Sequence, residues 1–161
     1  MLEKIKYYFC LRSVDKDISD CKFDIALEKL NFLIKADFKP SVTYLKRGLL
    51  CKKLFMYDSA YSDFTFIITH CADKTNAYYE RLFINFEISN FYQAISDANT
   101  ILKWDSDNND VKRIKFLSLT YSSEKEAAYK FIQSMSYSPI ISFTILSDIL
   151  IAPVSTSILK I

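Results

Sequence analysis

The sequence predicts an all-α protein in which similar helical hairpins stack side by side as a solenoid. The chain has 161 residues, of which 50% are hydrophobic and 16% aromatic, so it can bury one substantial core. It contains one glycine and three prolines. So few helix breakers favour long helical stretches, and they disfavour Rossmann and P-loop folds, which need glycines at positive-φ positions. An internal repeat divides these helical stretches into hairpins.

The repeat has a period of 34 residues. Residues 41–74 align without gaps on residues 75–108. The aligned pairs are Tyr44 with Tyr78, Arg47 with Arg81, Tyr57 with Phe91, Ala60 with Ala94, Asp63 with Asp97, and Ile67 with Ile101. The same spacing reaches back to Ala26 and forward to Ala128. Four alanines in one register are hard to attribute to chance, so we treat the period as real.

Each repeat unit is predicted to hold two helices joined by a turn. In residues 41–74, one helical stripe starts at Tyr44, the turn lies near residues 56–58, and a second stripe starts at Ala60. An alanine there lets the two helices approach closely. We expect a repeat domain over residues 1–136, with units at about 7–40, 41–74, 75–108 and 109–136. No unit can bury its own face, so the stack forms one cooperative body.

These features resemble the tetratricopeptide repeat (TPR) family, whose unit is a 34-residue helix–turn–helix. The matching residues are Tyr44, Arg47, Gly48, Cys51, Ala60, Phe64 and Ala72 in one unit, and Tyr78, Arg81, Leu82, Asn85, Ala94, Ala98 and Ser106 in the next. Leu82 replaces the family's glycine, and the closing proline is missing from both units. The resemblance covers about residues 7–136. It implies a right-handed α-solenoid that acts as a non-catalytic scaffold or adaptor for protein–protein interaction.

The C-terminal residues 137–161 are strongly apolar. Ser138-Pro139 is typical of a helix start and Ala152-Pro153 of a helix stop, so we expect a capping helix over about 139–151. A partner could also cover this segment, or it could anchor the chain as a membrane-attached adaptor. Asp148 argues against the anchor, because a carboxylate in the middle of a spanning helix costs about 3 kcal/mol.

The sequence contains no recognisable catalytic or metal site. His70 is the only histidine, and the four cysteines form no CxxC pair, so we expect no enzyme activity, no metal and no cofactor. The 21 basic and 19 acidic side chains nearly balance, which gives no reason to expect nucleic acid as a partner. Buried free thiols would fit a reducing, cytoplasmic location, with a ciliary or cytoskeletal assembly left open.

The resemblance places a partner-binding groove on the first helix of each unit. The residues it assigns to this groove are Leu45, Leu49, Lys52, Lys53, Tyr79, Phe83, Phe86, Glu87, Arg113, Leu117 and Tyr121. Aromatic and aliphatic side chains there suit a peptide or an amphipathic helix of a protein partner. The alternative, equally weighted for Phe83 and Phe86, is that they pack against neighbouring helices.

Two other binding modes would use residues of the same helices. Arg47 and Arg81 could clamp a phosphate, but packing of their stems between helices is the preferred interpretation. Co-chaperone TPR domains bind a chaperone C-terminal tail through lysine and asparagine side chains. The corresponding positions here hold Leu45 and Leu49 in one unit, and Glu80 would repel a terminal carboxylate, so such a tail is not expected.

Overall fold

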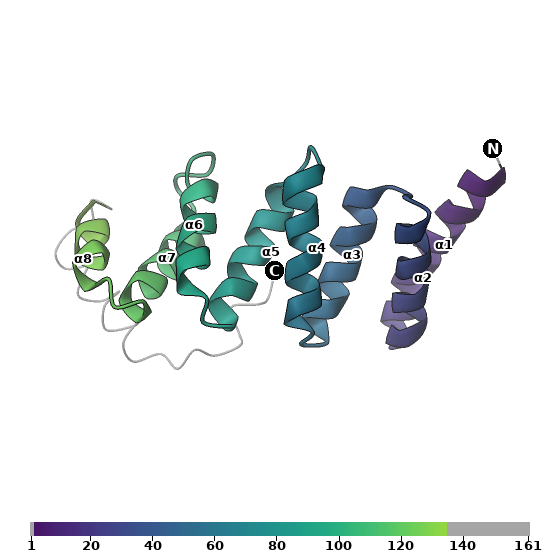
Figure 1. Cartoon of the computed structure of the whole chain (residues 1–161), viewed down its shortest axis with the longest axis horizontal. Helices are drawn as coiled ribbons and strands as arrows, with labels where there is room; N and C mark the ends of the chain where they lie inside the picture. Colours follow the sequence, from purple (N-terminus) through teal and green to yellow (C-terminus); the bar gives the residue numbers. More distant parts are fainter. Residues whose placement is uncertain (1, 135–161) are drawn as a thin grey trace.

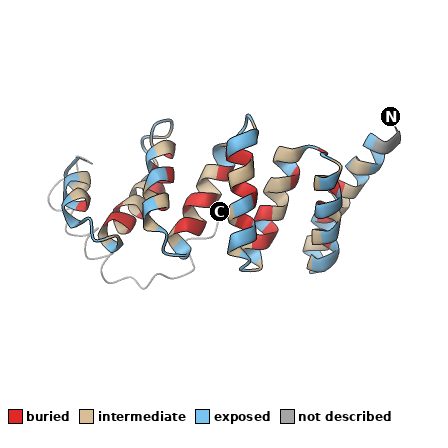
Figure 2. Ribbon diagram, in the orientation of Figure 1, coloured by how far each residue is buried: buried red, intermediate tan, exposed pale blue. Residues whose placement is uncertain are grey.

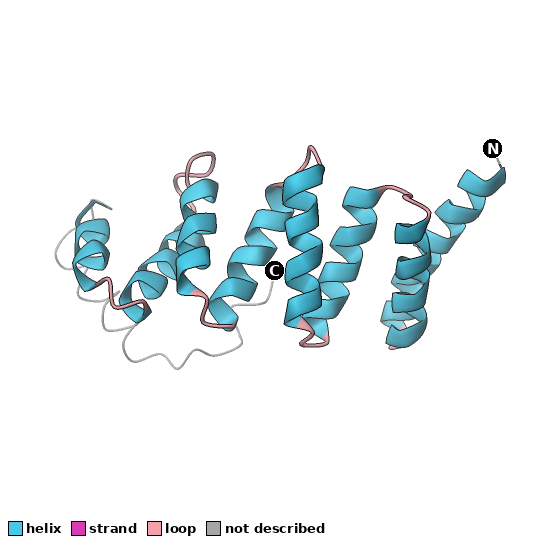
Figure 3. Cartoon of the chain, viewed as in Figure 1, coloured by secondary structure: helices cyan, strands magenta, loops and turns pink. Residues whose placement is uncertain are grey.

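The computed structural model describes residues 2–134, and this part of the chain is helical throughout, apart from short connections (Figures 1 and 3). Within this range there are eight α-helices and no β-strand, so the predicted all-α class is confirmed. The helices are α1 (Leu2–Ser19), α2 (Phe23–Lys35), α3 (Pro40–Lys53), α4 (Tyr57–His70), α5 (Thr75–Glu87), α6 (Phe91–Ile101), α7 (Asn109–Tyr121) and α8 (Lys125–Ser134).

The helices form a row of hairpins in two layers. Each helix contacts the next one along the chain. In Figure 1 the even-numbered helices lie in front and the odd-numbered helices behind them. We call the odd-numbered helices first helices and the even-numbered ones second helices. The first helices α3, α5 and α7 begin at Pro40, Thr75 and Asn109, which is close to the 34-residue spacing of the sequence.

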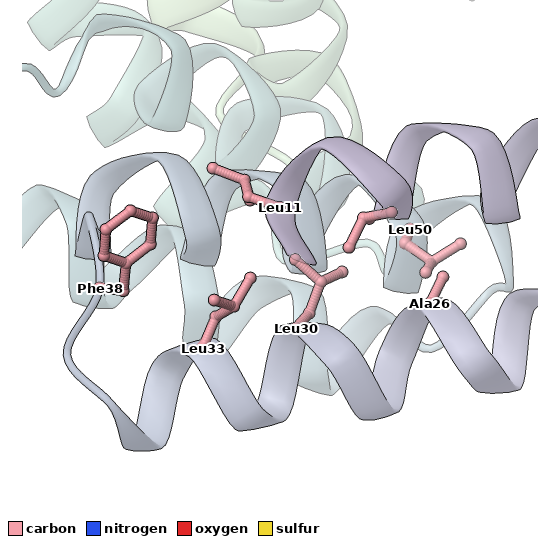
Figure 4. Packing of buried hydrophobic residues seen from close by; sticks show 7 residues of the cluster. Leu11, Ala26, Leu30, Leu33, Phe38 and Leu50 are labelled. Atoms are coloured by element: carbon pink, nitrogen blue, oxygen red, sulfur yellow. The ribbon is translucent and has the colours of Figure 1, made fainter. Parts of the chain in front are cut away.

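The recurring alanine lies at the contact between the two helices of each hairpin. Ala26, Ala60 and Ala94 have no exposed surface, and Ala128 is 4% exposed. Buried residues accordingly follow the inner faces of the helices along the row (Figure 2). In Figure 4, Ala26 and its neighbours on α2 point towards α1, where they meet Leu11. The small side chain therefore marks the position of closest packing, as the sequence predicts.

The turn inside each hairpin has the same backbone geometry in all four hairpins. A residue with positive φ ends the first helix, and the next N–H bonds to the carbonyl five residues earlier, which is the Schellman motif. The positive-φ residues are Cys21 (58°), Phe55 (59°), Ser89 (61°) and Ser123 (68°), each 34 residues from the next. None is glycine, so the low glycine content does not prevent left-handed turns. Because glycine is scarce, these left-handed positions are occupied by residues whose side chains make positive φ less favourable.

The C-terminal predictions lie outside the described residues. This applies to the expected capping helix at about 139–151 and to the membrane anchor considered for residues 137–161. Among residues 2–134, no helix has both the length and the apolar character needed to cross a membrane.

Candidate functional site

The residues assigned to the groove occupy equivalent positions on three first helices, where equivalent means 34 residues apart. The series are Leu45, Tyr79 and Arg113; Leu49, Phe83 and Leu117; Lys52 and Phe86; and Lys53, Glu87 and Tyr121. The helices that carry them, α3, α5 and α7, lie in one layer (Figure 1). We call these eleven residues the first-helix surface. The fold thus places all of them on neighbouring helices of one layer.

The α3 part of the first-helix surface is apolar at one end and charged at the other. Leu45 is half-buried and packs against the cluster around Phe64, whereas Leu49 is 38% exposed. The Lys52 ammonium pairs with the Glu80 carboxylate of α5. Leu49 is therefore the exposed aliphatic side chain of this part of the surface, and the Lys52–Glu80 pair links α3 to α5.

The aromatic residues of α5 are only partly available. Tyr79, Phe83 and Phe86 are half-buried against the cluster between α5, α6 and α7. The Tyr79 hydroxyl donates to Asp105 at 2.7 Å, and the Asn108 amide donates to the same carboxylate at 2.8 Å. Burial and the Asp105 contact raise the pKa of Tyr79, and the Asn108 and Tyr79 donors lower the pKa of Asp105. Tyr79 consequently fastens α5 to the loop before α7.

On α3 and α7, the last residue of the helix lies against the first residue of the preceding second helix. Tyr121, at the end of α7, has its ring 5.4 Å from that of Phe91, at the start of α6. Lys53, at the end of α3, has its ammonium 5.1 Å above the ring of Phe23, at the start of α2. Tyr121 remains 51% exposed despite this contact. It is an aromatic side chain at the solvent boundary, a common type of anchor for a protein ligand.

The remaining three residues of the first-helix surface differ in exposure. Arg113 and Leu117 are half-buried, and Glu87 is exposed. Together with Lys53, which is also exposed, Glu87 gives the surface charges of both signs beside its apolar side chains. Such a mixture can bury apolar residues of a ligand and orient its charged residues.

Arg47 is held by acceptors on both neighbouring second helices. Its Nε and Nη2 donate to the Asp63 carboxylate at 2.9 and 2.5 Å, and its Nη1 donates to Asn31 at 2.6 Å. The hydrogen bond with Asp63 raises the pKa of Arg47. The guanidinium thus links α3 to its own hairpin partner α4 and to α2 in the preceding hairpin.

Arg81 repeats this arrangement one hairpin further along. Its Nε and Nη2 donate to Asp97 at 3.0 and 2.7 Å, and its Nη1 donates to Thr65 at 3.2 Å. Arg81 is 8% exposed; burial acts to lower its pKa, but the Asp97 contact outweighs this and raises it. Both guanidinium groups therefore donate to side chains of two second helices each, a carboxylate on one and an amide or hydroxyl oxygen on the other. Their role as interhelical links agrees with the preferred interpretation of the sequence.

Asp63 and Asp97 align in the repeat, but their ion pairs with the arginines were not predicted from the sequence. The available signal was a constant separation: Asp63 follows Arg47 by 16 residues, and Asp97 follows Arg81 by the same number. Two residues of opposite charge that repeat together across a hairpin turn indicate an ion pair between its helices. Both carboxylates are buried, at 1% exposure.

The single histidine lies at the end of a helix. His70 is the last residue of α4, and its Nδ1 lies 2.6 Å from the Thr69 hydroxyl. Its ring stacks on Phe66 with centroids 4.4 Å apart. Over residues 2–134, no group of three or more histidine, cysteine or acidic side chains is close enough together to hold a metal ion.

The four cysteines are free thiols, but they do not share one environment. Cys51 is buried, Cys10 and Cys71 are half-buried, and Cys21 is exposed. The expectation of buried thiols is therefore wrong for Cys21, which occupies the left-handed position of the first turn. Burial raises the pKa of Cys51, Cys10 and Cys71, which keeps these thiols protonated and poorly reactive.

Two solved structures share this arrangement of helices. One, described as "Crystal structure of MamA protein", superposes with a TM-score of 0.70 over 83% of this chain and 72% of that one, at 21% sequence identity. The other, "MamA RS-1 ArsTM double mutant", has a TM-score of 0.71 over 80% of this chain and 72% of that one, at 13% identity. The fold is a helical-repeat solenoid. No protein-family model and no curated protein sequence matches the chain.

Proposed function

We propose that this chain is a non-catalytic scaffold of the TPR type, which holds a peptide or an amphipathic helix of a partner protein on its first-helix surface. The observation that carries the proposal is the alignment of Leu49, Phe83 and Leu117 at one equivalent position on three neighbouring first helices. An extended or helical ligand that crosses α3, α5 and α7 would meet an apolar side chain on each. The free thiols fit a reducing compartment such as the cytoplasm.

The exposed members of this surface identify the residues to test. Leu49 and Tyr121 lie on its first and last helices and are open to solvent. They lie outside the hydrogen-bond networks that hold the helices together, unlike Tyr79, whose hydroxyl bonds to Asp105. A glutamate at both positions would put charge at either end of the binding surface with little disturbance of the core.

The experiment compares two double variants as bait in a quantitative pull-down with mass spectrometry. The test variant is Leu49→Glu/Tyr121→Glu. The matched control is Ile25→Glu/Tyr92→Glu, which changes one aliphatic and one aromatic residue of similar exposure on second helices. Both should melt close to the parent protein. We expect the test variant to recover at least tenfold less of the proteins that the parent captures, and the control to recover as much as the parent. The reason is that truncation of an anchor residue typically costs about 2 kcal/mol or more of binding free energy.

Two outcomes would contradict the proposal. If the test variant captures the same proteins as the parent, the partner binds elsewhere. If the control loses them equally, the second helices carry the interaction.

A further inference from the structure

Two neighbouring hairpins expose apolar side chains at the edge of the stack where the hairpin turns lie. The turns inside the hairpins follow one edge of the row, which is the lower edge in Figure 1. At this edge Phe55 is 77% exposed and Tyr92 is 69% exposed, the highest values for large apolar side chains in residues 2–134. Met56 and Ile88, beside the same two turns, are 44% and 42% exposed. We call these four residues the turn-edge patch.

The repeat shows that the fold does not require apolar residues at these positions. The residues equivalent to Phe55 are Cys21, Ser89 and Ser123, those equivalent to Met56 are Lys22, Asn90 and Glu124, and those equivalent to Tyr92 are Asp24, Asp58 and Glu126. The Phe55 ring makes an edge-to-face contact with Tyr57, at 6.1 Å between centroids, and still keeps most of its surface in solvent. Apolar side chains at positions that other hairpins leave polar indicate a contact surface.

The two turns are neighbours, so the four side chains form one patch. Helix α4 begins at this edge and α5 ends at it, and the two helices pack against each other. Residues 56–57, at the start of α4, therefore lie beside Glu87 and Ile88, at the end of α5. In the preceding hairpins, Lys53 at the end of α3 lies in the same way beside Phe23 at the start of α2.

The patch has a positive charge on one side and a negative charge on the other. Lys53 and Glu87 are the last residues of α3 and α5, at equivalent positions, and both are exposed. Neither forms an ion pair among residues 2–134. The start of α4 lies between them along the row, because α4 packs against both α3 and α5. A rotation of 180° about the middle of the patch exchanges its two charged sides, so the patch is complementary to a second copy of itself.

We propose that the turn-edge patch is the interface of a symmetric homodimer, in which Lys53 of each copy pairs with Glu87 of the other. The apolar side chains then cover each other, with Phe55 of one copy against Ile88 and Tyr92 of the other. A twofold interface uses the same surface on both copies, so the assembly closes at two subunits. Lys53 and Glu87 also belong to the first-helix surface, but the dimer forms from this chain alone and does not depend on the proposed partner binding.

The test is sedimentation equilibrium of the purified full chain, compared between two charge-reversal variants and their mixture. Lys53→Glu brings two acidic side chains together at each charged contact, and Glu87→Lys brings two basic side chains together. Each variant alone should therefore dimerise about tenfold more weakly than the parent. In an equal mixture, the acidic side chains of one variant face the basic side chains of the other. We expect this mixture to form a heterodimer about as tightly as the parent dimerises.

A serine variant tests the apolar part of the interface. Phe55→Ser introduces the residue found at the equivalent turn position of two other hairpins, so the fold should tolerate it. The matched control is Phe9→Ser, which removes an aromatic side chain of similar exposure, 68%, from α1. Phe55→Ser should weaken dimerisation about tenfold or more and Phe9→Ser less than about twofold, while both variants unfold at temperatures close to that of the parent.

Four outcomes would overturn the proposal. A parent protein that stays monomeric up to about 1 mM would show that the patch does not hold a second copy. A mixture that dimerises no better than the single variants would show that Lys53 and Glu87 do not face each other. Equal effects of Phe55→Ser and Phe9→Ser would place the contact outside the turn-edge patch. A monomer that binds phosphatidylcholine vesicles through Phe55 would assign the patch to a lipid surface.

Discussion

Phe64 of α4 fills the space in which a side chain at Gly48 of α3 would begin. A Cβ added at Gly48 would lie 2.7 Å from Cε1 of Phe64, too close for any real contact. In the next hairpin the sizes are reversed, because the equivalent residues are Leu82 and Ala98, which are both fully buried in one cluster. Each pair holds one large and one small side chain, so the hairpins keep similar packing with different residues.

The two pairs should therefore be exchangeable only as units. Gly48→Leu alone should lower the free energy of unfolding by about 1–3 kcal/mol through overpacking, and Phe64→Ala alone by about 3–5 kcal/mol through the cavity it leaves. The double variant Gly48→Leu/Phe64→Ala recreates the pair found in the next hairpin. It should lose at least about 1 kcal/mol less than the sum of the single losses. Urea denaturation of all four proteins measures this coupling, and additive losses would show that the residues do not compete for the same space.

The left-handed turn residues should be improvable with glycine. Ser89 has φ of 61° and is exposed, so Ser89→Gly removes backbone strain without removing a buried contact. We expect it to stabilise the chain by about 0.5–1 kcal/mol, since the relief of strain exceeds the added entropy of the unfolded chain. Ser96→Gly, at an exposed position inside α6, should destabilise by about 1 kcal/mol. The Tm should therefore rise for Ser89→Gly and fall for Ser96→Gly. A shift of the same sign in both variants would contradict the turn geometry.

The Arg81–Asp97 pair should be more costly to break than to remove. Asp97→Ala leaves a guanidinium in a site that is 8% exposed, without its carboxylate, and should cost about 3–5 kcal/mol. Arg81→Met/Asp97→Ala removes the stranded charge as well, so the double variant should be more stable than the single one. Urea denaturation measures the free energy of unfolding of the single and the double variant. A double variant that is less stable than Asp97→Ala would show that the charge is not buried as described.

Acid should weaken the contact between Tyr79 and Asp105. The Asn108 and Tyr79 donors lower the pKa of Asp105 below its ordinary value of 3.8. A carboxyl group with a lowered pKa in the folded state contributes stability above that ordinary value, and the contribution disappears as the pH falls through the lowered pKa. Tyr79→Phe should raise the pKa of Asp105. The variant should also unfold more easily than the parent protein at neutral pH, and this difference in the free energy of unfolding should become smaller in acid. An NMR titration of the Asp105 carboxyl group measures this, and an unchanged pKa would contradict the contact.

The sequence was sufficient to predict the hairpins because close helix packing constrains residue size at a fixed interval. Ala26, Ala60, Ala94 and Ala128 are placed correctly because a larger residue there would separate the two helices. The turn geometry was not predictable in the same way. Phe55 adopts positive φ because the helices on both sides impose it, and the residue type gives no local sign of this.

The candidate site was less predictable than the fold. The sequence placed its residues at equivalent positions on first helices, but exposure depends on contacts between hairpins. The sequence does not distinguish Tyr79 from Phe86 as a contact for a ligand. In the structure, the Tyr79 hydroxyl is hydrogen-bonded to Asp105, 26 residues away in the sequence, and Phe86 packs on Phe91 and Tyr121. The identity of a ligand depends on the side chains that remain exposed, so Leu49 and Tyr121 are more informative than the half-buried aromatics.

The 34-residue register sets the contact between the two helices of each hairpin, and substitution of Ala94 tests this most directly. Ala94 has no exposed surface, whereas Ala72, in the connection between α4 and α5, is exposed. Ala94→Leu should overpack its hairpin and lower the free energy of unfolding by about 1–3 kcal/mol, and Ala72→Leu should change it by less than about 0.5 kcal/mol. The measurement is the urea unfolding curve of each purified variant. If Ala94→Leu unfolds together with the parent protein, the register is wrong.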